Sequence, residues 1–141
     1  MNTQVDMTNQ NLTLRVYSFY QILVNKKIDN IQILFKDQAV LSWGPYKFVG
    51  KDNISKWVKE LWALFPTLTI QEKSLEIYGL TIKHEFIISF TTAEGRIGWL
   101  PCVGLFKFQD NEIIQLDINL KHGYMAVNRD EIERVKPHPT K

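Results

Sequence analysis

Apolar residues recur at intervals of three and four in two segments of the first half of the chain, which predicts amphipathic helices. These segments are residues 12–24 and residues 53–65. A shorter helix is predicted from Asp29, which stands where an N-cap residue belongs. Pro66 ends the helix at residues 53–65, because proline cannot continue the helical hydrogen bonds. A short strand is expected at residues 39–43, between the second and third helices.

Strand patterns fill the second half of the chain, with glycine, aspartate and asparagine at the turns. The predicted strands cover residues 68–78, 81–92, 96–109 and 112–120. A last short helix is predicted at residues 130–135. Helices followed by antiparallel strands predict an α+β fold, with three N-terminal helices packed on a curved sheet. We expect a single domain over residues 1–141, with its core at about 12–122 and a C-terminal tail at 123–141.

Composition and charge narrow the range of functions for this chain of 141 residues. The net charge is +2 and Lys26–Lys27 is the only adjacent basic pair, so no nucleic-acid partner is expected. No apolar run reaches the roughly 18 residues of a membrane span, so no membrane partner is expected. A single cysteine and a polar start without a signal-peptide pattern predict a cytoplasmic location. The chain lacks CxxC, HExxH, GxGxxG and P-loop motifs, so we expect neither a metal nor a cofactor.

The predicted strand at residues 81–91 carries a histidine on its apolar face. His84 alternates in step with the isoleucines and phenylalanines of this strand, so we expect it to be buried. Histidine titrates near neutral pH, which makes His84 a candidate catalytic base. The alternative is a structural histidine that is hydrogen bonded to a carbonyl group or a tyrosine.

Tyr20 lies on the apolar stripe of the first predicted helix. Its hydroxyl group is a candidate hydrogen-bond donor inside a cavity, and the alternative is a core tyrosine whose hydroxyl meets water. Tyr17 lies on a neighbouring part of the same helix.

Residues 98–106, GWLPCVGLF, favour a strand but carry Pro101 and Gly104. Proline cannot donate a hydrogen bond to a neighbouring strand, and glycine has no side chain to pack. One hypothesis is therefore that this segment forms a bulge, whose hollowed surface is the cavity wall against which a flat apolar ligand lies. The alternative is that Pro101 bends a sheet that has to curve. Cys102 is expected to be a small buried hydrophobe rather than a reactive thiolate. The residues expected to line a pocket are Trp43, Trp62, Phe86, Leu100, Cys102, Gly104, Phe106 and Leu116.

Three segments together carry a resemblance to a known family. They are VYSFYQILVNKKIDNIQILFKDQAVLSW (16–43), VGKDNISKWV (49–58) and VGLFKFQDNEIIQLDINL (103–120). Their order and spacing resemble the NTF2-like superfamily, particularly its SnoaL-like members. The resemblance implies an NTF2-like (cystatin-like) cone and a homodimer formed through the face of the sheet. The superfamily includes isomerases, polyketide cyclases, epoxide hydrolases and binding domains, so the fold alone does not name a function.

The resemblance allows the catalytic positions of the ketosteroid isomerases to be compared with this chain. In those enzymes a tyrosine of the first helix and a protonated aspartic acid bind the oxyanion, and a second aspartate moves the proton. Tyr20 matches the tyrosine. The base position falls on or beside Trp43 and the oxyanion acid position falls at Gly104, so both carboxylates are missing.

The limonene epoxide hydrolases use an Asp-Arg-Asp trio that activates water. The arginine and first aspartate positions fall near Glu85 and Ile87, and the last aspartate falls near Ile118. Asp117 matches that position only after a shift of one residue. Alternation with Leu116 and Ile118 points Asp117 away from the apolar face, so its role as a cavity base stays open against a solvated or interface role.

Three functions remain open at this level. The first is a cofactor-independent enzyme that uses acid/base chemistry on a small apolar carbonyl or epoxide, with His84 or Asp117 as the base and Tyr20 as the donor. The second is a non-catalytic protein that binds a small apolar molecule. The third is a dimerisation domain whose cavity is filled by its own side chains.

Overall fold

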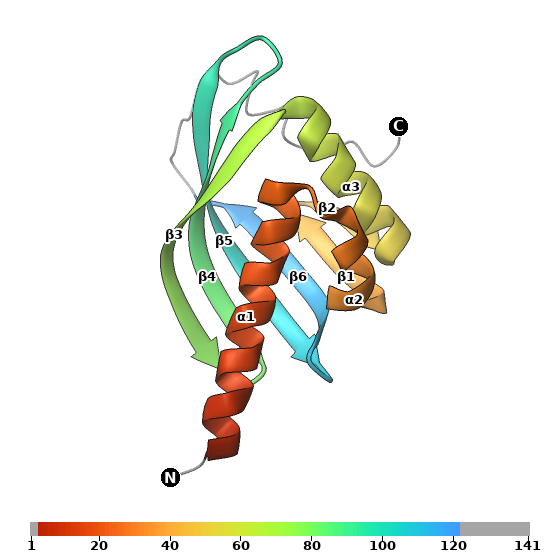
Figure 1. Ribbon diagram of the computed structural model, residues 1–141, viewed down its shortest axis with the longest axis vertical. Helices are drawn as coiled ribbons and strands as arrows, with labels where there is room; N and C mark the ends of the chain where they lie inside the picture. Colours follow the sequence, from red (N-terminus) through yellow and green to blue (C-terminus); the bar gives the residue numbers. More distant parts are fainter. Residues whose placement is uncertain (1–2, 122–141) are drawn as a thin grey trace.

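Helices and strands alternate in the first half of the chain, and strands alone follow them (Figure 1). The computed structural model describes residues 3–121. The helical elements are α1 (Thr3–Asn25), the 3₁₀ turn η1 (Ile28–Asn30), α2 (Ile31–Leu34) and α3 (Lys51–Leu64). The strands are β1 (Phe35–Trp43), β2 (Tyr46–Val49), β3 (Thr67–Tyr78), β4 (Thr81–Thr91), β5 (Ile97–Gln109) and β6 (Glu112–Leu120). The predicted order is confirmed, with β2 as an additional strand.

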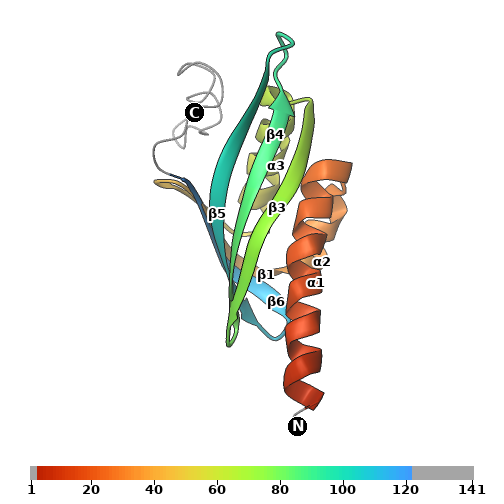
Figure 2. The same cartoon turned by 90° about the vertical axis from the view of Figure 1, so that its left-hand side faces the viewer.

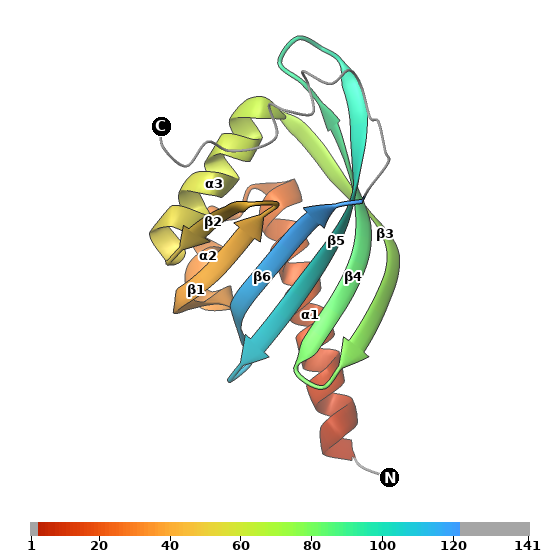
Figure 3. The ribbon, with the colours of Figure 1, turned by 180° about the vertical axis from the view of Figure 1, so that it is seen from behind.

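The six strands form one sheet in the order β2–β1–β6–β5–β4–β3. Among these strands, only the β1–β6 pair is parallel, and the other neighbours are antiparallel. The helices α1 and α3 lie on one side of the curved sheet, which we call the inner face (Figures 1 and 2). None of the described helices covers the opposite, outer face (Figure 3). The predicted α+β class, with three helices on a mostly antiparallel sheet, is confirmed.

The boundaries of some elements differ from the prediction. α1 begins at Thr3 instead of near Leu12, because the helix continues through polar residues beyond the part that packs on the sheet (Figure 1). β1 begins at Phe35, earlier than predicted. β2 is not among the predicted strands. Its four residues pair with β1 across a turn at Gly44, whose φ of +57° suits glycine. The helix predicted at residues 130–135 lies outside the described residues.

Alternation along the central strands fills the inner face with apolar side chains. In β4, every second residue from Ile82 to Phe90 is buried, and β5 follows the same pattern. Strand register places one row of inner-face residues across the whole sheet. This row contains Leu75, His84, Gly104, Ile118, Trp43 and Tyr46. His84 is therefore held within the sheet, on the face that α1 covers.

Candidate functional site

Two residues that the sequence analysis singled out, Tyr20 and His84, lie in contact inside the core. The hydroxyl oxygen of Tyr20 is 2.6 Å from Nδ1 of His84, and both side chains are buried. The centroids of the two rings are 5.2 Å apart. The predicted burial of His84 is confirmed, and its partner is a tyrosine and not a backbone carbonyl.

Local sequence explains why the two side chains meet. Tyr20 shares the buried stripe of α1 with Val16 and Leu23, at helical spacings of four and three residues. His84 alternates with the buried residues Ile82 and Phe86 along β4. α1 lies along the inner face of the sheet (Figure 1), and Tyr20 on its stripe contacts His84 and Phe86 of β4.

Burial sets the protonation state of both groups. Burial raises the pKa of Tyr20 well above its usual range, since the phenolate would lose its hydration. Burial lowers the pKa of His84 below its ordinary value of 6.5, although the charge of Glu72 opposes this effect. Both side chains are therefore neutral at neutral pH, and together they offer one proton donor and one proton acceptor.

The other nitrogen of His84 faces a carboxylate that the sequence analysis missed. Nε2 lies 3.4 Å from Oε1 of Glu72, a contact that does not complete a hydrogen bond. The same Oε1 atom accepts a 2.6 Å hydrogen bond from the hydroxyl group of Tyr17. That hydrogen bond is the main cause that raises the pKa of Tyr17 to about 12. Tyr17, Glu72, His84 and Tyr20 thus form one continuous chain of polar contacts.

A bulge in β3 brings Glu72 to this position. The pairing of β3 with β4 shifts between Glu72 and Ser74, so Lys73 is an extra residue in the strand. The bulge lets Glu72 and Leu75 both face α1, although three positions separate them. A signal for this was present in the sequence, because the apolar residues of β3 before and after the bulge are out of phase with each other.

The residues predicted to line a pocket are mostly buried against one another. Those that are at most 2% exposed are Trp43, Phe86, Leu100, Cys102, Phe106 and Leu116. The rings of Phe86 and Phe106 lie 5.0 Å and 6.0 Å from the ring of Tyr20, so these two residues adjoin the candidate site. Trp43 instead packs on Trp57, at 5.6 Å between ring centroids. The partly buried Trp62 donates its indole N–H to the backbone carbonyl of Leu23 at 2.9 Å.

The hypothesis of a bulged, hollow wall at residues 98–106 is wrong. The pairing of β4 with β5 runs without a shift from Thr91–Ile97 to Thr81–Lys107. A Cβ atom at Gly104 would lie 3.2 Å from a ring carbon of Phe86 and 3.2 Å from one of Phe106. Gly104 therefore makes room for two aromatic rings that close over it.

Asp117 does not join the Tyr20–His84 pair, so its interpretation as a cavity base is corrected. It lies on the outer face of β6, because the buried residues on either side of it, Leu116 and Ile118, face the helices. Its Oδ2 atom accepts a 2.7 Å hydrogen bond from Gln115. Cys102 is on the inner face, but burial raises the pKa of its thiol, so it stays protonated.

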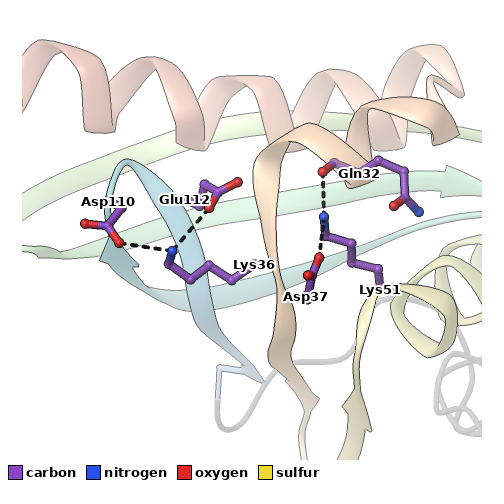
Figure 4. Close-up of polar contacts among 6 residues, drawn as sticks. All are labelled: Gln32, Lys36, Asp37, Lys51, Asp110 and Glu112. Atoms are coloured by element: carbon purple, nitrogen blue, oxygen red, sulfur yellow. Dashed lines mark hydrogen bonds and ion pairs between the residues drawn. The ribbon is translucent and has the colours of Figure 1, made fainter.

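A separate groove lies where β1 and β6 begin and β5 ends. It has a volume of about 480 Å³ and is lined by Lys36, Asp37, Gln38, Gln109, Glu112 and Ile114. Figure 4 shows Lys36 between Asp110 and Glu112, at 3.1 Å and 3.3 Å. It also shows Lys51 with Asp37, at 3.0 Å. Both lysines are thus paired with carboxylates. The groove shares no residue with the Tyr20–His84 pair.

Within residues 3–121, no group of three or more His, Cys, Asp or Glu side chains is placed to hold a metal ion. None of the helices in this range combines the length and the apolar character that a membrane-spanning helix needs.

Comparisons with known proteins identify the fold. No protein-family model and no curated protein matches the sequence. An NTF2-like protein from Anabaena variabilis ATCC 29413 is 15% identical in sequence and has a TM-score of 0.75. The match covers 86% of this chain and 94% of that protein. A SnoaL-like protein from Jannaschia sp. CCS1, assigned as a polyketide cyclase, is 12% identical in sequence and has a TM-score of 0.72. The match covers 79% of this chain and 86% of that protein. An LEH-like epoxide hydrolase from M. tuberculosis is 13% identical in sequence and has a TM-score of 0.69. The match covers 79% of this chain and 84% of the hydrolase.

Proposed function

We propose that this chain, which has the NTF2-like fold found in SnoaL-like proteins, is a cofactor-independent acid/base catalyst acting on a small apolar molecule. The expected substrate is a carbonyl compound or an epoxide that lies beside the Tyr20 hydroxyl group. The observation that carries this proposal is the buried 2.6 Å contact between that hydroxyl group and Nδ1 of His84. A neutral acid and a neutral base in hydrogen-bond contact, surrounded by apolar side chains, can accept a proton from a bound molecule and return it.

We propose different roles for the two residues. Both nitrogens of His84 already face protein atoms, so the Tyr20 hydroxyl group is the one that meets the substrate. In the forward direction the Tyr20 oxygen accepts a proton from the substrate carbon next to the carbonyl group, which leaves an enolate, while the hydroxyl proton of Tyr20 passes to Nδ1. The reverse transfer returns the proton to another substrate atom, which amounts to an isomerisation. The rings of Phe86 and Phe106 provide an apolar wall next to Tyr20.

Hydrogen–deuterium exchange tests this proposal without knowledge of the natural substrate. Small cyclic ketones and enones are incubated with the protein in D₂O, and loss of the proton next to the carbonyl is followed by NMR. We expect the protein to accelerate exchange, and we expect Tyr20→Phe and His84→Gln each to slow it by about 100-fold or more. Glu85→Gln is the matched control, because Glu85 neighbours His84 in β4 but faces outward to Lys121. Equal rates in all four proteins contradict the proposal.

A second candidate function, binding of an apolar ligand without catalysis, is favoured by a different residue. The indole N–H of Trp57 is fully buried and has no acceptor among the described residues. A buried donor without a partner costs about 1–3 kcal/mol, and a ligand oxygen would satisfy it. The test is quenching of tryptophan fluorescence by added ketones. Quenching that is lost in Trp57→Phe but kept in Tyr20→Phe supports ligand binding at Trp57 and not catalysis at Tyr20.

We also propose that two copies of the chain associate through the outer face of the sheet. The residues Pro101, Val103 and Leu105 form a half-buried apolar stripe along the outer face of β5. Lys83 and Asp117 flank Leu105 on the neighbouring strands. A two-fold axis along the stripe sets Lys83 of one copy opposite Asp117 of the other, as a self-complementary interface requires.

A further inference from the structure

The carboxylate of Glu72 links the buried Tyr20–His84 pair to solvent. The His84 side chain is fully buried, whereas the Glu72 side chain is 45% exposed. Oε1 of Glu72 lies 3.4 Å from Nε2 of His84 and accepts the hydroxyl proton of Tyr17 at 2.6 Å. Tyr17 therefore fixes the carboxylate that stands between the imidazole ring and water.

This arrangement selects one tautomer of His84. A carboxylate accepts hydrogen bonds and donates none, so the nitrogen that faces it carries the hydrogen. Nε2 has no completed hydrogen bond within the described part of the chain, and the acceptor oxygen Oε1 of Glu72 lies 3.4 Å from it. With the hydrogen on Nε2, Nδ1 is the acceptor, and the Tyr20 hydroxyl group donates to it.

We infer that Glu72, held in place by Tyr17, is a positioning residue that fixes the His84 tautomer and exchanges protons between His84 and solvent. When Nδ1 takes the proton of the Tyr20 hydroxyl group, Nε2 gives its own proton to the Glu72 carboxylate. Glu72 exchanges that proton with water and returns one to Nε2, while Nδ1 returns a proton to the Tyr20 oxygen. The imidazole ring stays neutral throughout, and its two nitrogens exchange roles. The use of this route in catalysis rests on the proposed function, whereas the tautomer and the exchange do not.

The groups around His84 are consistent with this role for Glu72. From α1 the titratable neighbours are Tyr17 and Tyr20, and from β3 the neighbour is Glu72. Phe86 stacks on the ring from its own strand, with 5.7 Å between centroids, and Gly104 is its partner on β5. Of these neighbours Glu72 is the carboxylate, and its side chain is 45% exposed, so it is the one that can relay a proton to water.

Nitrogen-15 NMR of His84 in the full-length protein tests the inference. In the wild type we expect hydrogen on Nε2, and in Glu72→Ala we expect a mixture of the two tautomers. Exchange of the buried proton with solvent should slow by about tenfold or more in the same variant. Tyr17→Phe keeps the Glu72 carboxylate but removes the hydrogen bond that holds it. We expect intermediate changes in the tautomer and in the exchange rate. This variant replaces Glu72→Ala if the latter does not fold.

Glu76 and Tyr78 provide matched controls, because the Tyr78 hydroxyl group donates to Glu76 at 2.6 Å on the exposed side of the same strand. Glu76→Ala and Tyr78→Phe should leave the His84 spectrum unchanged. An unchanged tautomer and exchange rate in both Glu72→Ala and Tyr17→Phe overturn the inference. The NMR measurement needs no substrate, so an altered tautomer together with no ketone exchange contradicts the proposed function and leaves this inference standing.

Discussion

Tyr20 and His84 lie 64 residues apart in the chain, and their side chains meet at 2.6 Å inside the core. The contact joins the first helix to a strand within the sheet, so the same hydrogen bond belongs to the candidate site and to the packing of α1. A variant that breaks it is therefore expected to change both stability and chemistry, and the two effects have to be measured separately.

Tyr20→Phe should lower the free energy of unfolding by about 1–3 kcal/mol. The phenylalanine ring keeps the packing against Phe86, but Nδ1 of His84 loses its buried partner. Urea denaturation followed by circular dichroism measures the change. Tyr78→Phe removes a hydroxyl group that is exposed, so it should stay within about 0.5 kcal/mol of the wild type. Equal losses in the two variants contradict the role of the buried hydrogen bond.

The stability of the protein should depend on pH through His84. Burial lowers the pKa of His84 in the folded protein below its ordinary value of 6.5, which the unfolded chain retains. As the pH falls through 6.5, the unfolded chain binds a proton that the folded protein does not bind, so acid favours unfolding. At higher pH neither state is protonated at this site, and the contribution is constant. The folded state is thus most favoured, as far as His84 is concerned, above pH 6.5.

Urea midpoints measured from roughly pH 7.5 to pH 5.5 test this dependence. The wild type should lose stability across this range, and His84→Gln should show a flatter curve because glutamine does not titrate. His84→Gln is also expected to be less stable than the wild type at the upper end. The same slope in both proteins means that other groups cause the pH dependence.

The positions of Tyr20 and His84 could be predicted from the sequence because each lies on an element with a clear apolar period. Three- and four-residue spacing oriented Tyr20 on its helix, and strict alternation oriented His84 on its strand. The same alternation correctly pointed Asp117 outward, and the shifted register borrowed from the epoxide hydrolases did not hold. Direct patterns within the chain were thus better guides than positions transferred from distant relatives.

Glu72 and the packing around Gly104 could not be predicted in the same way. The apolar residues before and after Glu72 are out of phase, which indicates a bulge in β3, but they do not fix the residue at which it falls, and that residue decides which side chains face α1. A glycine in a strand indicates missing side-chain volume, but not what fills it. Here the rings of Phe86 and Phe106 fill it, and that depends on rotamers that no local pattern fixes.

Gly104→Ala should destabilise the protein by about 1–3 kcal/mol, because overpacking forces neighbouring side chains to move. The new methyl group would lie 3.2 Å from a ring carbon of Phe86 and 3.2 Å from one of Phe106. The double variant Gly104→Ala with Phe86→Leu removes one of these two rings. We expect it to be more stable than the sum of the two single effects, which a double-mutant cycle in urea measures. Additive effects contradict a direct clash.

Leu105→Lys should weaken self-association if two copies meet through the outer face of the sheet. Leu105 lies in the apolar stripe of β5, and a lysine there places two like charges close together across a two-fold interface. We expect the dissociation constant to rise by about 100-fold or more, as measured by sedimentation equilibrium. Leu14→Lys is the matched control, because Leu14 is 61% exposed on α1, on the other side of the sheet. Two results contradict this interface. One is a wild-type protein that is monomeric at all concentrations, and the other is a Leu105→Lys variant that associates as strongly as the wild type.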